Sequence, residues 1–438
     1  MSSPTANVFP FSDQTVREVI ERASSNGYES WWSRTAGTGY CASPIHLIRS
    51  GMSGDESVTV RCKNRRQIVC PSCSDLYAGD TWHLVHAGLA GSVDVPAAVS
   101  GRLAVFVTLT APSFGPVHTI RSDGRACHPG YQLVCSHHIA VGCKLMHSRD
   151  DELLGQPLCL SCYDYVGHVL FTWHAPELWG RFAIDLRRQV RRAARAAGHH
   201  EPRVSFVKVM EMQRRGSPHF HAVVRLDPND DDDSVLFDTR ELVRLVGISA
   251  ARVHLDVTGY SGELVTLRFG PQVDVQALDG YDFDPTLGRK VSGYLAKYVT
   301  KSVSDFGLTP RRIAPSSIDR LDTTEHYKNL LRAIARLAEG DPDRAEMTNW
   351  LHTLGYRGHV TTKSRRYSTT MGALRARRAA HMTRVDVPLI EDDTEWTFRA
   401  AGHRTSGERL LAISAAIAVR ESRWAARQLT DDEERQSL

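Results

Sequence analysis

The chain has 438 residues, of which 42% are hydrophobic and 24% are charged, and these fractions are ordinary for globular proteins. Its length accommodates two or three domains with separate cores. The formal net charge of +4 is too small to indicate nucleic acid as a partner by bulk electrostatics alone. The N-terminus lacks a signal-peptide pattern, and no run approaches the roughly 18 apolar residues that a membrane span needs. We therefore expect a cytoplasmic protein without a membrane partner.

The first predicted element is a helix from Asp13 to about Ser25, because Ser12 can cap it and apolar residues recur on one face. Cysteines follow, and Cys70-Pro71-Ser72-Cys73 forms the kind of turn with which two thiolates bind one tetrahedral zinc ion. A reducing compartment disfavours disulfides, although an isolated Cys-x-x-Cys pair would also fit a redox function. With two further cysteines nearby, we predict a zinc site whose ligands are Cys41, Cys62, Cys70 and Cys73.

A helix at residues 74–90 and a strand at residues 103–110 are predicted next, followed by a polar segment rich in cysteine and histidine. This segment ends at a second Cys-x-Ser-Cys pair, formed by Cys159 and Cys162. We therefore predict a second zinc module, inserted at about residues 121–165. Our choice for its ligands is Cys135, Cys143, Cys159 and Cys162, while Cys127, His137 and His147 stay open as substitutes.

Basic residues concentrate in two places. Residues 163–197 are predicted to be mostly helical, with an interruption near Pro176, and five arginines crowd the end of this segment. More cations and hydroxyl groups lie in residues 355–378. Such clusters suit phosphate contacts, although a solvated helix face would have the same composition. We predict DNA contacts from Arg188, Arg192, Lys363, Arg365 and Arg366.

The segment Pro218-His219-Phe220-His221 is the most informative stretch of the chain. Alternating apolar and β-branched residues on both sides of a glycine-containing turn predict a hairpin of two strands over residues 204–226. Residues two apart in a strand point to one face, so His219 and His221 project together. Antiparallel pairing brings Glu211 beside them, and the three side chains can then bind a divalent cation. A hairpin with two structural histidines is the alternative.

Residues 292–301 are predicted to form a helix, in which Tyr294 and Tyr298 share a face because they are four residues apart. Lys297 and Lys301 have the same spacing on a neighbouring face. Alone, the tyrosines would be packing residues of an amphipathic helix. Together with a cation bound upstream, phenol and ammonium groups suit attack by a tyrosine on a DNA phosphodiester. We predict Tyr294 and Tyr298 as nucleophiles, Lys297 as a charge that stabilises the phosphate, and Lys301 as a DNA contact.

In this order and spacing, Glu211, residues 218–221 and residues 294–301 resemble the signatures of HUH endonucleases, the rolling-circle replication initiators. The paired tyrosines resemble the two-tyrosine branch of that class, and Phe106-Val107-Thr108-Leu109-Thr110 is similar to its first-motif strand. Two further segments resemble the actinomycete plasmid initiators of the RepSA type: residues 157–179 and 355–370.

The resemblance implies an α+β fold, with an antiparallel sheet of four or five strands flanked by helices. It also implies that Glu211, His219 and His221 hold Mg²⁺ or Mn²⁺, and that a tyrosine forms a 5′-phosphotyrosyl intermediate and leaves a free 3′-hydroxyl. The expected protein is a plasmid rolling-circle initiator, which nicks origin DNA, single-stranded or cruciform, and rejoins the strand at termination. Because no P-loop motif is present, we expect a host helicase to unwind the DNA and a host polymerase to extend the 3′ end.

Two other classes of function stay open. A conjugative relaxase or a transposase has the same chemistry, although relaxases usually place the tyrosine before the histidines and a single-tyrosine transposase would not need Tyr298. A non-catalytic, zinc-dependent DNA-binding regulator would use the His-x-His segment structurally. The regulator would cleave no DNA and would form no covalent adduct, so these classes are separable by experiment.

Three consecutive regions are expected along the chain. Residues 1–100 form a helical, zinc-binding region, residues 101–310 form the endonuclease domain with the inserted zinc module, and residues 311–438 form a helical, basic DNA-binding region. Further strands are predicted at residues 253–257, 263–269 and 272–275. Further helices are predicted at residues 241–246, 325–337, 344–354, 371–382 and 407–429.

Overall fold

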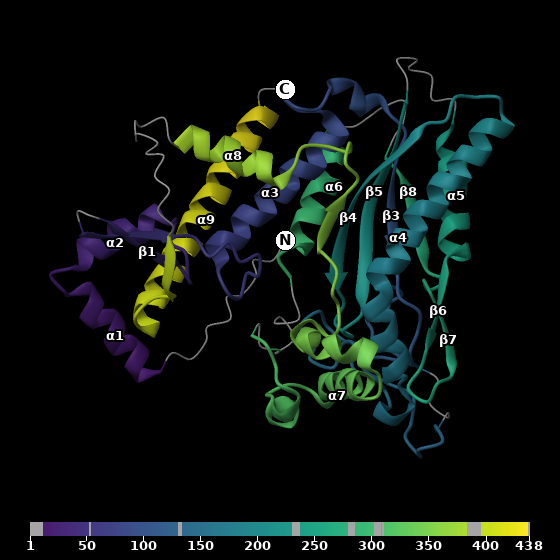
Figure 1. The fold of residues 1–438 in the computed structure, drawn as a ribbon, viewed down its shortest axis with the longest axis horizontal. Helices are drawn as coiled ribbons and strands as arrows, with labels where there is room; N and C mark the ends of the chain where they lie inside the picture. Colours follow the sequence, from purple (N-terminus) through teal and green to yellow (C-terminus); the bar gives the residue numbers. More distant parts are fainter. Residues whose placement is uncertain are drawn as a thin grey trace. The chain divides into compact units, whose positions relative to one another are not determined.

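The structure is a computed structural model that describes residues 12–51, 54–129, 134–229, 237–278, 285–301, 308, 311–382 and 396–436. The chain folds into two compact units, one of residues 1–79 and 378–438 and the other of residues 80–377. Helices α3 (Pro71–Ala90) and α8 (Met371–Met382) each include residues of both units. This division differs from the three consecutive regions expected, because both ends of the chain belong to one unit (Figure 1).

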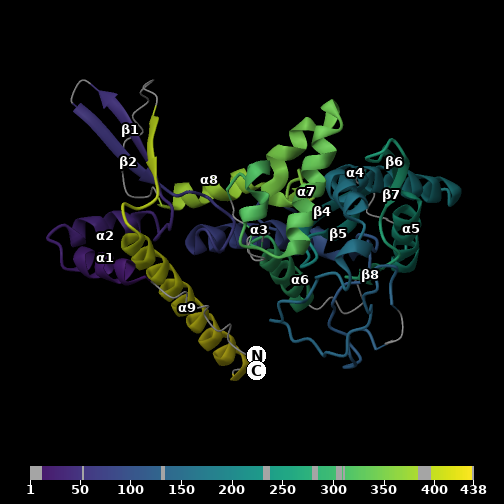
Figure 2. The same ribbon diagram turned by 90° about the horizontal axis from the view of Figure 1, so that it is seen from below.

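The first unit contains a three-stranded antiparallel sheet in the order β10-β1-β2 (Figure 2). Strands β1 (Ile45–Gly51) and β2 (Gly54–Val60) form a hairpin, and β10 (Thr397–Ala401) pairs with β1 from the other end of the chain. These strands were not predicted from the sequence. The five side chains of β10 are all exposed, so no alternation of apolar and polar residues marks this strand.

The first and last helices of the described chain pack against each other in the first unit. The predicted first helix is confirmed together with its cap, because Ser12 Oγ accepts a hydrogen bond from the backbone N–H of Thr15. This helix packs against the last helix of the chain, and there Arg22 Nε donates to the Glu408 carboxylate at 2.7 Å. The helices are α1 (Asp13–Ala23), α2 (Tyr28–Gly37) and α9 (Ser406–Gln436).

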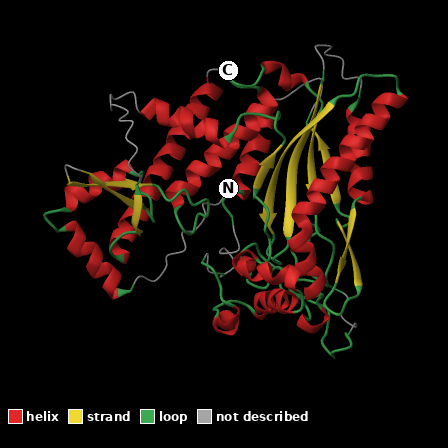
Figure 3. Ribbon diagram, in the orientation of Figure 1, coloured by secondary structure: helices red, strands yellow, loops and turns green. Residues whose placement is uncertain are grey.

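The second unit is built on a five-stranded sheet in the order β8-β3-β5-β4-β9, in which all neighbouring strands are antiparallel (Figure 3). The expectation of four or five antiparallel strands agrees with this sheet. The predicted strands at residues 253–257 and 263–269 are also present, but they form a separate two-stranded sheet. The strands are β3 (Ala104–Leu109), β4 (Arg203–Met212), β5 (Pro218–Asp227), β6 (His254–Thr258), β7 (Leu264–Arg268), β8 (Val273–Ala277) and β9 (Thr361–Lys363).

One face of the five-stranded sheet carries the main hydrophobic core. Val105, Val107 and Leu109 alternate along β3 and are buried in this core. Helices α4 (Tyr165–Ala196) and α5 (Thr239–Arg252) cover the same face (Figure 1). Full burial of one such aliphatic side chain contributes about 1.5–3 kcal/mol, so this face holds the sheet in place. Side chains on the opposite face of the sheet are not part of this core.

The predicted interruption of α4 at Pro176 is wrong, because the helix continues through this residue. A proline in a helix interior lacks one hydrogen bond and costs about 3 kcal/mol. Leu178, Trp179 and Phe182 follow it and are buried in the core, where the Trp179 ring lies 5.8 Å from the Phe220 ring. The burial of these large side chains outweighs the local cost of the proline.

The last part of the second unit differs in detail from the prediction. The helix expected at residues 344–354 is a 3₁₀ helix, η5 (Pro342–Thr353), whereas α7 (Glu325–Glu339) and α8 are confirmed. Residues 355–370 contribute the edge strand β9 and the fully buried Tyr367, whose hydroxyl donates to Val85 O at 3.2 Å. Gly88 is needed there, because an added Cβ would lie 2.2 Å from the Tyr367 ring. Within the described part of the chain, no helix is long and apolar enough to cross a membrane.

Candidate active site and metal centres

The β4–β5 hairpin brings the predicted metal ligands together on the sheet face opposite the main core. Glu211 on β4 is directly paired with His219 on β5, and His221 follows two residues later on the same face. His221 Nε2 lies 3.3 Å from Glu211 Oε2, and the rings of the two histidines are 4.5 Å apart. On the other side, Thr108 of β3 has its hydroxyl 3.3 Å from His221 Nδ1. Thr108 belongs to the segment that resembled a first-motif strand.

The two predicted nucleophiles meet this histidine pair. Tyr294 and Tyr298 lie on α6 (Pro285–Tyr298), and their ring centroids are 4.7 Å apart. The His221 ring lies 5.2 Å from Tyr294 and 5.3 Å from Tyr298, so it contacts both. Phe106 of β3 completes the wall, 5.7 Å from the rings of Tyr294 and His221. Helix α6 and strands β3 and β5, which are distant from one another in the sequence, thus place two phenols beside one imidazole.

The lysine that reaches this site is Lys301. Helix α6 ends at Tyr298, so Lys301 lies beyond the helix and can turn back toward the sheet. Its ammonium is 3.3 Å from Glu211 Oε1 and 4.7 Å from the centre of the Tyr298 ring. Lys297, to which the sequence assigned the stabilising charge, is exposed on the helix. The sequence predicted both lysines within one helix of residues 292–301, and its pattern did not indicate that the helix ends at Tyr298.

Burial changes the ionisation of two groups in the site. Burial raises the pKa of Tyr298, and its hydrogen bond with Tyr294 and the charge of Glu211 act in the same direction. Burial lowers the pKa of His219 to about 3, with smaller contributions from His221 and Arg215. His219 is therefore neutral at physiological pH, and a neutral imidazole is the form that binds metal ions.

Three groups of cysteine and histidine side chains have converging ligand atoms. In each group the four ligand atoms lie within 4.8 Å of one another. Among the described residues Glu211, His219 and His221 do not form such a tight group. All nine cysteines of the chain belong to one of the three. The groups are Cys41, Cys62, Cys70 and Cys73; His118, Cys127, Cys143 and His147; and Cys135, His137, Cys159 and Cys162.

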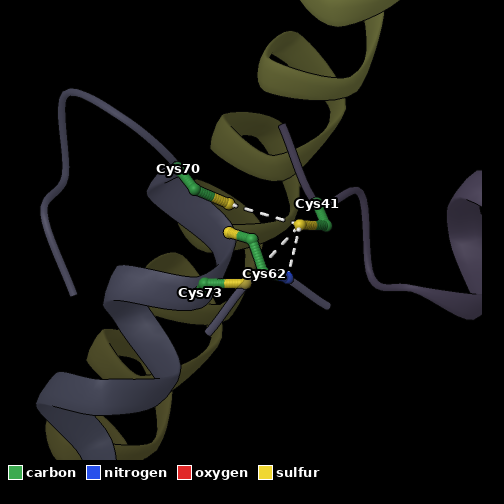
Figure 4. A group of neighbouring side chains, drawn as sticks. All are labelled: Cys41, Cys62, Cys70 and Cys73. Carbon is green, nitrogen blue, oxygen red and sulfur yellow. Dashed lines mark hydrogen bonds between the residues drawn. The ribbon is translucent and has the colours of Figure 1, made fainter. Parts of the chain in front are cut away.

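The first group contains the four cysteines chosen from the sequence, and it lies within the first unit (Figure 4). The Cys41 sulfur is 3.7 Å from the sulfurs of both Cys70 and Cys73. A disulfide would require about 2.05 Å, whereas thiolates bound to one tetrahedral zinc ion at about 2.3 Å lie about 3.8 Å apart. Backbone N–H groups also point at the sulfurs, from Ala42 to Cys70 and from Cys62 to Cys41, both at 3.3 Å.

The inserted segment holds two groups where one was predicted. The expected set of Cys135, Cys143, Cys159 and Cys162 is not brought together, because Cys143 lies in the other group and His137 takes the fourth position. Isolated β-bridges explain the difference. The bridge between His128 and Cys143 carries Cys143 toward Cys127, and the bridge between Val134 and Ala140 folds Cys135 and His137 into a turn of their own.

The predicted DNA-contacting cations lie in different environments. Arg188 and Arg192 are exposed on α4, which covers the sheet face away from the tyrosines. The Lys363 ammonium donates to the backbone carbonyls of Ser364 and Arg365 at 3.3 and 3.1 Å. Arg365 and Arg366 are exposed beside it. Sequence reasoning also missed Gln213 and Arg215, which lie near His219, and it missed His118, which joins Cys127, Cys143 and His147 in the second group.

Comparison with known proteins gives consistent results over nearly the whole chain. The family model described as "RepSA: Replication initiator protein, pSAM2" matches residues 27–417. A replication initiator protein of Streptomyces ambofaciens is 36% identical to this chain over 459 residues, which cover 96% of each protein. No solved structure shows significant similarity.

Proposed function

The chain belongs to the RepSA family of replication initiator proteins, and we propose that it starts plasmid rolling-circle replication by nicking origin DNA with a tyrosine nucleophile. The observation that carries this proposal is the convergence of Tyr294 and Tyr298 on His221, which itself lies 3.3 Å from Glu211. A phenol pair from α6 here meets an imidazole pair and a carboxylate from one face of the sheet. They are the groups that transesterification of a phosphodiester by the two-tyrosine branch of HUH endonucleases requires.

Glu211, His219 and His221 are the residues that would hold a divalent cation, Mg²⁺ or Mn²⁺. The donor set fits, because it combines one carboxylate with two imidazoles on one face, and His219 is kept neutral by burial. A bound cation would polarise the scissile phosphate and neutralise its charge. The Glu211 carboxylate also pairs with the Lys301 ammonium at 3.3 Å, so this position already accommodates a positive charge.

In the proposed reaction a tyrosine oxygen forms a bond to phosphorus while the bond from phosphorus to the 3′ oxygen breaks. The phenolic proton is lost, the leaving 3′ oxygen gains one, and the DNA remains joined to the protein through a 5′-phosphotyrosine. We assign the first attack to Tyr294, which is 40% exposed, because single-stranded DNA can reach it directly. Tyr298 is half-buried and its raised pKa disfavours the anion, so it suits the second step, when DNA already covers the site.

The experiment that tests the proposal is incubation of the full-length protein with single strands of its replicon's origin and Mn²⁺. A protein–DNA adduct stable to denaturing electrophoresis is expected, with the phosphate on Tyr294 or Tyr298. Tyr260→Phe provides a matched control, because Tyr260 is an exposed tyrosine of the second unit outside the cluster. If no adduct forms on either origin strand or on a cruciform origin, the non-catalytic regulator is the better description. Host helicase and polymerase are proposed partners for the steps that follow.

A further inference from the structure

The second cysteine–histidine group, which the sequence did not separate from the third, has the geometry of a metal site. His118 Nδ1 is 3.0 Å from His147 Nε2, and Cys143 Sγ is 3.4 Å from the same nitrogen. In a tetrahedral zinc site with Zn–N near 2.0 Å and Zn–S near 2.3 Å, neighbouring ligand atoms lie about 3.3–3.6 Å apart. Cys127, Cys143 and His147 are all buried. The spacing and the burial therefore suit one zinc ion.

The surroundings of this group also match those of metal ligands. His147 presents its other nitrogen, Nδ1, to the Asp151 carboxylate at 2.6 Å. A carboxylate behind a histidine is the usual partner that orients a metal-binding imidazole. The Cys127 sulfur accepts a hydrogen bond from the backbone N–H of Thr119 at 3.2 Å, which would stabilise a thiolate. These contacts come from residues that are not ligands, so they form an independent observation.

Residues 149–155, which follow His147 in the chain, are held against the turn of the β4–β5 hairpin. Arg214, in the hairpin turn, donates to Arg149 O at 2.6 Å and to Asp151 O at 2.8 Å. Gly155 has a φ of +81°, and a Cβ added there would lie 2.6 Å from the carbonyl carbon of Arg214. Backbone therefore packs directly on backbone at this point, and this contact and the two hydrogen bonds join residues 149–155 to the hairpin turn.

The turn of the β4–β5 hairpin also contacts His219, a proposed metal ligand of the active site. Arg215 Nε donates to Gln213 Oε1 at 3.0 Å, and Gln213 Nε2 lies 3.4 Å from His219 Nδ1. Arg215 also donates to the carbonyls of Ala111 and Pro112, both at 3.1 Å, just after strand β3. The two arginines of the turn thus donate hydrogen bonds to backbone carbonyls of the insert and of the segment after β3.

We propose that His118, Cys127, Cys143 and His147 bind a third structural zinc ion, and that this ion positions His219 through the contacts of Asp151 and Gly155 with the β4–β5 turn. The sequence had predicted only two ions. The part concerning His219 rests on the proposed function, whereas the ion itself does not. Asp151 and Arg214 are positioning residues in this arrangement.

The metal content of the purified full-length protein tests the ion directly. We expect three zinc ions per chain by elemental analysis against quantitative amino-acid analysis, and two or fewer would overturn the proposal. Cobalt substitution gives a second readout that needs no variant, because thiolate-to-cobalt absorption scales with the number of bound thiolates. All nine cysteines should contribute to it, whereas seven would mean that Cys127 and Cys143 bind no metal.

Variants separate this site from its neighbour. Cys127→Ser combined with Cys143→Ser should lose one zinc ion of three and keep the others. The matched control is His138→Asn, because His138 is an exposed histidine of the same insert outside both groups, with a φ of +59° that asparagine tolerates. The control should keep three ions. A double-serine variant that retains three would overturn the assignment of these ligands.

Amide hydrogen exchange tests the link to the hairpin. In Asp151→Asn we expect the zinc content to be unchanged, the amides of residues 213–217 to exchange at least several-fold faster, and Mn²⁺ to bind several-fold more weakly. Asp123→Asn is the control, because this exposed aspartate of the same insert pairs with Arg121 instead. Unchanged exchange and Mn²⁺ affinity in Asp151→Asn would refute the positioning role. Three zinc ions in a protein that forms no DNA adduct would refute the proposed function and leave the third ion standing.

Discussion

Tyr294 and Tyr298, the proposed nucleophiles, share one helix face, yet their surroundings differ. Tyr294 is 40% exposed, whereas burial and the neighbouring Glu211 raise the pKa of Tyr298. Burial of a phenol disfavours its anion, and only the anion is a strong nucleophile. Under the proposed mechanism this difference favours sequential use, in which DNA held by the first tyrosine would change the environment of the second.

We expect Tyr294→Phe to lower the rate of the first cleavage by roughly tenfold or more, and Tyr298→Phe to lower it less. The phenol that remains in Tyr294→Phe is Tyr298, the less accessible of the two. Each single variant should retain some nicking, and the double variant should form no adduct. Rejoining should suffer more than cleavage in both single variants, since it needs a second nucleophile while the first is occupied. Peptide mapping of the adduct checks the assignment, and an adduct on Tyr327 or Tyr367 in the wild type would contradict it.

Lys208 is a buried cation that the sequence did not single out. It faces the main core from β4, with its ammonium 4.8 Å above the Phe220 ring and 3.1 Å from His359 O. Burial lowers its pKa from 10.5 to about 7. Between these two values the unfolded chain binds a proton that the folded chain does not, so the free energy of unfolding rises with pH in that window.

We expect Lys208→Met to remove this pH dependence, because methionine fills a similar volume without a charge. The difference in unfolding free energy between wild type and variant should change by roughly 1 kcal/mol per pH unit from pH 7 to pH 9, with the wild type gaining as pH rises. Denaturant titrations at pH 7, 8 and 9 measure it. Comparison with the variant cancels other groups that titrate in this range. Parallel curves would show that Lys208 stays protonated when folded.

At the scale of elements, the β4–β5 hairpin determines which side chains meet. The register pairs Glu211 with His219, so a slip of β5 by one residue would move the two histidines, which are proposed metal ligands, to the core face. We expect His219→Ala to lower nicking by about a hundredfold or more. Even the loss of a residue that only hydrogen-bonds a metal ligand costs about 10- to 100-fold, and His219 is itself a proposed ligand.

Glu211→Ala should weaken Mn²⁺ binding, with partial rescue of nicking at high Mn²⁺ concentration. Circular dichroism should show an unchanged fold.

The end of α6 determines which lysine enters the site. Lys301 pairs with Glu211 at 3.3 Å, so it would compete with the proposed divalent cation for the carboxylate. We expect Lys301→Gln to tighten Mn²⁺ binding in the absence of DNA by about two- to fivefold, since a partly exposed ion pair is worth up to about 1 kcal/mol. Lys297→Gln is the control and should leave Mn²⁺ affinity unchanged. Isothermal titration calorimetry distinguishes the two, and weaker binding in Lys301→Gln would contradict this role.

At the scale of the whole molecule, the two ends of the chain form one unit around the first cysteine group. Ala412 and Ala416 of α9 are buried, and Ile413 packs on the cysteine group. His403 Nε2 lies 2.9 Å from Cys41 O. The last helix therefore belongs to the same compact unit as the N-terminal residues, whereas the sequence had grouped it with residues 311–377.

We expect deletion of residues 396–438 to destabilise the N-terminal unit, so that the truncated protein is poorly soluble or loses one zinc ion per chain. A milder test is Glu408→Gln, which weakens the pair with Arg22 and should cost about 1–3 kcal/mol because Glu408 is buried. Glu421→Gln, at an exposed position of the same helix, should change stability by less than about 0.5 kcal/mol. A truncated protein with full zinc content and an unchanged melting temperature would show that the ends are independent.

Local patterns alone determined several features of this protein. Ser12 and the apolar period of the following residues located α1, and the alternation around the glycine turn located β4 and β5. The same period placed His219 and His221 on one strand face, and a spacing of four placed Tyr294 and Tyr298 on one helix face. Each of these depends on residues close together in the chain, so the repeat of the helix or strand is sufficient to predict it.

Tertiary structure decided which of these local features meet. The division of the five cysteines of the insert between two groups depends on β-bridges within that segment, because their spacing in the sequence allowed several ligand sets. The choice of Lys301 depends on where α6 ends against the sheet, and the continuity of α4 through Pro176 depends on packing of the residues after it. The union of α1 with α9 joins residues almost 400 positions apart. Contacts between distant segments carry no periodic signal in the sequence, and only the folded backbone brings them together.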